Sequence, residues 1–173
     1  RPGGKSVSDK PKILVLGVGN ILLKDEGIGV KIVELLQERY SFSDNVEIMD
    51  GGTLGLRLCD YITQCDFLIV VDAVLGGEEP GTIYRLIDDD LKLSLSFKNS
   101  MHDQDLLETL ACCEIIGHRP DAVVVGIEPD SYKSGMGIDL TDTLAAKMPE
   151  MTAMVLEEIV KAGGEYKEKA TAG

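Results

Sequence analysis

The chain has 173 residues, of which 44% are hydrophobic and 27% are charged, and its formal net charge is −13. This composition is typical of a folded domain and not of a disordered chain. The negative charge argues against binding to nucleic acids or anionic membranes, because such binding requires clustered Lys and Arg, and the apolar runs are too short to span a bilayer.

The first half of the chain alternates between predicted strands and helices. Helical spacing of apolar residues predicts a helix over residues 26–40 and a shorter helix near 54–63. Apolar runs predict three strands in this half: 12–17, 46–50 and 67–72. Strands that alternate with helices indicate an α/β fold with a mainly parallel sheet.

The second half contains one strand that should run against the others. Residues 82–88 follow a loop of nine residues, 73–81. Such a loop is too short for a crossover to a parallel neighbour, which takes a dozen residues or more. Further on, we expect a helix over 101–116, a strand over 122–128 and a helical region over 140–162. Pro149 should break that region into two helices.

We therefore expect one domain over residues 11–164, with flexible tails at 1–10 and 165–173. The expected fold is a three-layer α/β/α sandwich, in which a five-stranded, mostly parallel sheet contains one antiparallel strand. The four cysteines show no C-x-x-C spacing, which favours buried thiols in a reducing compartment. Because no signal-peptide pattern is present either, the cytoplasm is the expected location.

Three residues far apart in the sequence are expected to meet at one edge of this sheet. Glu26 follows the first strand, Asp72 ends a buried strand, and His102 opens the helix over 101–116. Ligands of doubly wound sheets bind outside the carboxyl ends of the strands, where the strand order reverses. Two carboxylates and an imidazole there would suit a divalent metal with open coordination positions, without choosing between nickel, zinc and other ions.

Each of the three residues also has a purely structural explanation. The helix dipole favours an acid such as Glu26 in a first turn, and Asp72 could cap the turn after its strand. A carboxylate that follows four apolar strand residues is nevertheless costly unless it is paired or bound. His102 could be a solvated residue of a helix start, with Ser100 as N-cap and Asp103 three residues on. The positive end of the helix would keep its ring neutral and able to bind a metal.

Two further polar residues complete the candidate set. Asp50 is followed by Gly-Gly-Thr at the same expected edge, where it could act as a base, orient a nucleophile or cap the next helix. His118 precedes a strand, so we expect it at the opposite edge in a structural role.

Common catalytic and cofactor motifs are missing. The sequence contains neither G-x-S-x-G nor H-E-x-x-H. A G-V-G-N turn follows the first strand, but Leu22 stands where a dinucleotide fingerprint has its third glycine. Asp25 and Glu26 would also repel a pyrophosphate at the helix start. A nucleotide-binding oxidoreductase is therefore disfavoured.

Five motifs give the chain a specific resemblance. The motifs are G-V-G-N-I-L-L-K-D-E-G-I-G-V at 17–30, D-G-G-T at 50–53, V-V-D-A at 70–73, M-H-D at 101–103 and V-G-I-E-P at 125–129. Together they resemble the signature of the [NiFe]-hydrogenase maturation endopeptidases, and the match runs in order from about residue 12 to 162. The segment 91–100, rich in Ser and Leu, matches no motif.

This resemblance implies a function and a role for each candidate residue. Members of the family remove a short C-terminal extension from the precursor of the hydrogenase large subunit after nickel insertion, and their fold is a five-stranded mixed sheet between helix layers. Their metal-contacting residues fall on Glu26, Asp72 and His102. The expected partner is that precursor, and nickel would be carried by the substrate instead of being a permanent cofactor. Asp50 is the candidate catalytic residue of an aspartyl endopeptidase-like site.

Two other classes remain open from the sequence. A metallo-exopeptidase of similar fold would cut short peptides without any hydrogenase precursor, although such enzymes usually need more metal ligands. A nickel-binding assembly chaperone would use the same three residues for delivery and leave the C-terminus of its client intact.

Overall fold

The central sheet has five strands in the order β3-β1-β4-β6-β5. The computed structural model describes residues 9–51, 58–98, 104–130 and 136–170. The parallel strands consist almost entirely of apolar residues, as expected where both faces of a sheet are covered. The strands are β1 (Ile13–Gly17), β3 (Val46–Asp50), β4 (Phe67–Ala73), β5 (Ile83–Leu86) and β6 (Asp121–Ile127).

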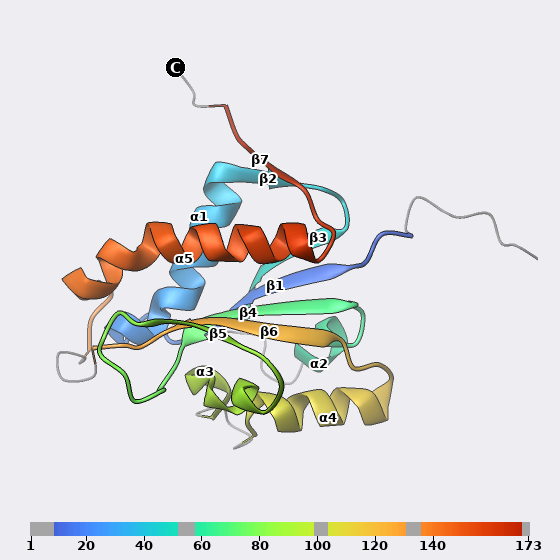
Figure 1. Cartoon of the computed structure of the whole chain (residues 1–173), viewed down its shortest axis with the longest axis horizontal. Coiled ribbons are helices and arrows are strands. Elements are labelled where there is room, and N and C mark those ends of the chain that lie inside the picture. The colour runs from blue at the N-terminus through green and yellow to red at the C-terminus, as the bar shows by residue number, and fades with distance from the viewer. Residues whose placement is uncertain (1–8, 52–57, 99–103, 131–135, 171–173) are drawn as a thin grey trace, which may run out of the picture.

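Helices cover both faces of the sheet, which makes the predicted three-layer α/β/α sandwich (Figure 1). One face packs against α1 (Ile28–Arg39) and α5 (Asp142–Lys161), and alternate strand residues such as Val15, Ile69 and Val125 point into that layer. The other face packs against α2 (Leu58–Ile62), the 3-10 turns of η3 (Asp88–Leu93), α3 (Leu95–Lys98) and α4 (Leu106–Ile116).

The prediction of one antiparallel strand is confirmed. Strand β5 runs antiparallel to β6, with Ile83 opposite Ile127 and Leu86 opposite Val124. The connection from β4 is too short for a crossover to a parallel neighbour, so the chain returns in the opposite direction.

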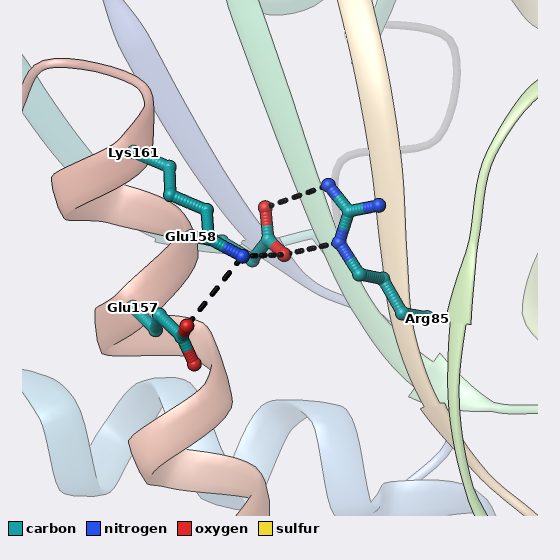
Figure 2. Close-up of polar contacts among 4 residues, drawn as sticks. All are labelled: Arg85, Glu157, Glu158 and Lys161. Atoms are coloured by element: carbon teal, nitrogen blue, oxygen red, sulfur yellow. Dashed lines mark hydrogen bonds and ion pairs between the residues drawn. The ribbon is translucent and has the colours of Figure 1, made fainter.

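The Arg85 side chain of β5 binds the Glu158 carboxylate of α5 and so connects the edge of the sheet to the helix above it (Figure 2).

Helix α4 begins five residues later than predicted. Its first residue is Leu106, and the Asp105 carboxylate accepts a hydrogen bond from the Glu108 amide while the Glu108 side chain accepts one from the Asp105 amide. This reciprocal capping box fixes the helix start. An unbroken helix over 101–116 is therefore wrong, and the predicted N-cap Ser100 lies outside the described residues. The residues before the helix supply η3 and α3, which the sequence did not predict.

Helix α5 is continuous, so the predicted break at Pro149 is wrong. The helix runs through the proline from Asp142 to Lys161. Proline costs one main-chain hydrogen bond inside a helix. Buried contacts on both sides of it, including those of Leu144 and Met151, hold the two halves on the sheet.

The predicted flexible tail from residue 165 is also partly wrong. Tyr166–Glu168 form β7, which pairs antiparallel with β2 (Tyr40–Phe42). Tyr40 was predicted to end the first helix, but it begins this strand, and its ring meets that of Tyr166 edge-on with centroids 5.6 Å apart. No helix in the described ranges is long and apolar enough to cross a membrane.

Candidate active site at the carboxyl edge of the sheet

The strand order reverses between β1 and β4. The chain passes from β1 to β3 on one side and then returns to β4 on the other, and all three strands are parallel. The carboxyl ends of β1 and β4 therefore diverge into separate loops, which is where open α/β sheets bind their ligands. Gly17 ends β1, with Asp50 of β3 opposite it on one side and Val71, the residue before Asp72, on the other.

Asp72 is fully buried, and each of its two carboxylate oxygens accepts two hydrogen bonds. Oδ1 accepts from the Ala73 amide at 2.8 Å and from the Ser96 hydroxyl at 2.6 Å. Oδ2 accepts from the Ser94 hydroxyl at 2.5 Å and from the Ser96 amide at 2.9 Å. The carboxylate is thus aimed and held by its own strand and by the η3–α3 segment.

The environment of Asp72 makes its charge costly to maintain. Burial raises the pKa of Asp72 to about 7, against the opposing effect of the hydrogen bonds from Ser94, Ser96 and Ala73. A carboxyl group with such a pKa gains most from a positive charge nearby, and perturbed groups of this kind are concentrated at functional sites.

Glu26 lies in η1 (Lys24–Gly27), the 3-10 turn that precedes α1 and packs against β4. Its side chain is half-buried, and within the described ranges its carboxylate has no hydrogen-bond partner. The position of Glu26 is set by a close approach between the main chain at the start of α1 and that of β4. A methyl group added to Gly29 would lie 2.0 Å from the Val71 carbonyl oxygen, so only glycine lets the start of α1 come this near to β4.

Asp25 anchors the loop that carries Glu26, a role that the sequence did not reveal. It is fully buried, and its carboxylate accepts hydrogen bonds from the Asp130 amide at 3.0 Å and the Thr141 amide at 2.8 Å, besides the Thr141 hydroxyl. The main chain adds a short parallel bridge between Leu23 and Gly137. The loop after β1 is therefore fixed to the segment between β6 and α5.

Asp50 and His118 lie at the edges where the sequence predicted them. Asp50 is the exposed last residue of β3, and the Gly51 amide after it bonds the Gly17 carbonyl oxygen at 2.8 Å. Since neighbouring strands are about 4.8 Å apart, the main chains of Asp50 and Asp72 are separated by roughly 10 Å. The exposed His118 precedes β6 at the opposite edge.

His102 lies outside the described residues, so its approach to Glu26 and Asp72 stays a prediction. Within the described ranges, no three side chains of His, Cys, Asp or Glu lie close enough together to hold a metal ion. The structure thus describes two carboxylates in adjoining segments. The Glu26 carboxylate has no hydrogen-bond partner within the described ranges, and the Asp72 carboxylate accepts hydrogen bonds from four donors.

Comparison with known proteins assigns the chain to a family. A family model described as "Hydrogenase maturation protease" matches residues 30–158, about three quarters of the chain. The chain belongs to the hydrogenase maturation protease family. As a member of that family it is a peptidase, of the endopeptidase type.

Individual relatives agree with the family model. The chain is 40% identical to the hydrogenase 2 maturation protease of Escherichia coli over an alignment of 156 residues. The alignment covers 89% of this chain and 94% of the relative. It is 38% identical to the hydrogenase expression/formation protein HoxM of Azotobacter vinelandii over 88% of this chain and 74% of the relative. The solved structure of the hydrogenase maturating endopeptidase HybD from E. coli superposes with a TM-score of 0.81 at 38% identity, covering 91% of this chain and 98% of that one.

Proposed function

We propose that this hydrogenase maturation protease removes the C-terminal extension of a [NiFe]-hydrogenase large-subunit precursor after nickel has been inserted. In this proposal Glu26, Asp72 and His102 contact nickel that the precursor already holds, so that cleavage follows metal loading. Nickel is then part of the substrate and not a resident cofactor. The cytoplasm is the proposed location.

The position of Asp72 carries the proposal. A fully buried carboxylate stands at the point where the strand order reverses, beside the turn that carries Glu26. Burial of a charge is costly unless the charge is compensated, and a cation brought by the substrate would compensate it at the moment of recognition. A metal at this point would also position or polarise the bond to be cut.

Asp50 is the proposed catalytic residue. It is exposed at the same edge as Asp72 and two strands away from it. A separation of roughly 10 Å between the main chains leaves room for a substrate segment between the nickel contacts and the group that assists hydrolysis. An Asp50→Asn variant should bind the precursor and cut it slowly.

A cleavage assay on purified precursor tests the proposal. The precursor is incubated with the enzyme, with and without nickel loading, and the products are weighed by mass spectrometry. We expect loss of the C-terminal extension only from the nickel-loaded precursor. Glu26→Gln, Asp72→Asn and His102→Ala should each slow this step by about 10- to 100-fold, the range seen when groups around a metal are removed.

The matched control for His102→Ala is His118→Ala, which removes the exposed histidine at the opposite edge. It should leave cleavage unchanged. Equal cleavage of nickel-free precursor, or normal processing by all three site variants, would refute the proposal. An intact client C-terminus under every condition would favour a nickel-delivering chaperone, and ready cleavage of short unrelated peptides would favour a metallo-exopeptidase.

A further inference from the structure

The hydrogen bonds of Asp72 leave no acceptor position open for a metal. Each oxygen binds one main-chain amide and one serine hydroxyl: Ala73 and Ser96 on Oδ1, Ser96 and Ser94 on Oδ2. A carboxylate oxygen has two lone pairs. Direct contact between Asp72 and a cation therefore requires that one of these four donors leave.

The two hydroxyls are the donors that can leave without a change in the fold. The Ala73 amide belongs to β4, and the Ser96 amide belongs to the first turn of α3, so both move only with the main chain. A serine hydroxyl leaves by rotation about its Cα–Cβ bond, which is a fast motion in side chains that are not fully packed.

Of the two serines, Ser96 is the one that lies towards the Glu26 turn. Ser94 is fully buried and its main chain bridges to Val74. Ser96 is only half-buried. A methyl group added to Gly19 would lie 1.8 Å from the Glu26 carbonyl oxygen and 3.5 Å from the Ser96 hydroxyl oxygen. The Ser96 hydroxyl therefore contacts Asp72 and also lies close to the turn that carries the second carboxylate.

We propose that the Ser96 hydroxyl occupies the nickel-binding position of Asp72 Oδ1 while the site is empty, and that it rotates away when nickel arrives. The inference rests on the proposed contact between Asp72 and nickel. After the exchange the Ala73 amide still holds Oδ1, while the Ser94 hydroxyl and the Ser96 amide still hold Oδ2. The carboxylate keeps its orientation and gains one open lone pair.

This exchange has a consequence for selectivity. Free nickel must replace a hydrogen bond to a charged group, so its net binding to the empty enzyme is weak. Nickel held by the precursor arrives together with the other contacts of a protein interface, which offset the lost hydrogen bond. The Ser96 hydroxyl thus favours a loaded client over the free ion.

The test measures binding of Ni²⁺ itself to the purified protein, by competition with a chromophoric chelator at about pH 8.5, where carboxylates are ionised. Ser96→Ala should bind Ni²⁺ about tenfold more tightly than the wild type, which is the change expected for one lost competing hydrogen bond. Ser96→Thr keeps the hydroxyl and should match the wild type. Ser94→Ala should bind no more tightly than the wild type.

Equal or weaker nickel binding by Ser96→Ala, including no measurable binding over the range in which nickel stays dissolved, would overturn the inference. Ser96→Gly removes the same hydroxyl and serves as the second variant if Ser96→Ala does not fold, which circular dichroism decides. Asp72→Asn should abolish binding. If it binds nickel as the wild type does, the proposed contact of Asp72 fails, and that failure is separate from a failure of the exchange at Ser96.

Discussion

Asp25 and Glu26 are neighbours in one turn, yet their carboxylates lie in different environments. Asp25 is fully buried and bonded to the main chain at Asp130 and Thr141, 105 and 116 residues further along the chain. Glu26 is half-buried, and in the described ranges its carboxylate has no such partner. The first residue therefore builds the edge of the sheet, and the second remains available to a ligand.

Replacement of Asp25 by Asn should destabilise the protein by about 2–4 kcal/mol. The change replaces a charged carboxylate, which accepts strong hydrogen bonds, by a neutral amide. The NH₂ group of the new side chain would also face the N–H and O–H donors that bind Asp25, and both effects are costly in a buried site. Urea unfolding measures the loss. Thr141→Val, which removes only the hydroxyl and keeps the Thr141 amide bond, is the milder control and should cost about 1 kcal/mol. Equal stability of Asp25→Asn and the wild type would contradict this account.

At the scale of the elements, one ion pair connects the edge strand β5 to α5. The Arg85 guanidinium contacts both carboxylate oxygens of Glu158, whose side chain is only 4% exposed, whereas that of Arg85 is 43% exposed (Figure 2). Lys161 lies 4.0 Å from the same carboxylate. The pair thus places one buried charge between the sheet and the helix layer.

Arg85→Met should lower the free energy of unfolding by about 1–3 kcal/mol. The full cost of an isolated buried charge is about 3–5 kcal/mol, and the exposure of Arg85 and the nearby Lys161 reduce it. Glu157→Gln, which breaks the exposed 3.5 Å pair between Glu157 and Lys161, is the matched control and should change stability by less than about 1 kcal/mol. The double variant Arg85→Met with Glu158→Met should recover much of the loss, and a double-mutant cycle measures the recovery.

The elements that follow from local pattern were predicted well, and the others were not. Strand β4 could be predicted from its run of adjacent apolar residues, and the direction of β5 from the length of the connection before it. The start of α4 depended on choosing between several possible caps, and only packing selects Asp105. Continuity of α5 through Pro149 and the pairing of β7 with β2 depend on contacts between distant segments, which local patterns do not contain.

The same distinction applies to the site. Asp72 could be predicted because a carboxylate after buried strand residues is conspicuous in the sequence. Ser94 and Ser96 could not, since alternation with Leu93, Leu95 and Phe97 shows only that their segment packs on the core. Their bonds to Asp72 appear only in three dimensions.

At the scale of the whole molecule, candidate chemistry and C-terminal packing occupy opposite edges of the sheet. Asp50, Asp72 and Glu26 lie at or near the carboxyl ends of the strands. The small β2–β7 sheet lies at the other end (Figure 1). There the Ser43 carbonyl oxygen accepts a hydrogen bond from the amide of Val46, the first residue of β3, and Gly164 lies close to Ile13 at the start of β1. Changes at one edge should therefore leave the other largely unaffected.

Deletion of residues 165–173 tests this separation. The truncated chain loses the β2–β7 ladder, the contact between the Tyr40 and Tyr166 rings and the bond from the Lys169 amide to the Arg39 carbonyl oxygen. We expect a loss of about 1–2 kcal/mol, or roughly 3–6 °C in Tm, with unchanged precursor cleavage at 25 °C. Slower cleavage by a truncated protein of normal stability would instead assign the C-terminal residues to client recognition.

The anchoring of Asp25 also bears on how this scaffold can diverge. Two of the groups that bind its carboxylate are main-chain amides, which every amino acid except proline provides. Side chains between these amides can therefore change over evolutionary time while both ends of the stretch stay attached to Asp25. Descendants of one ancestral gene can thus acquire new surfaces beside an unaltered framework, with proline excluded at the two positions whose amides bind Asp25 and at Gly137, whose amide bonds the Leu22 carbonyl oxygen.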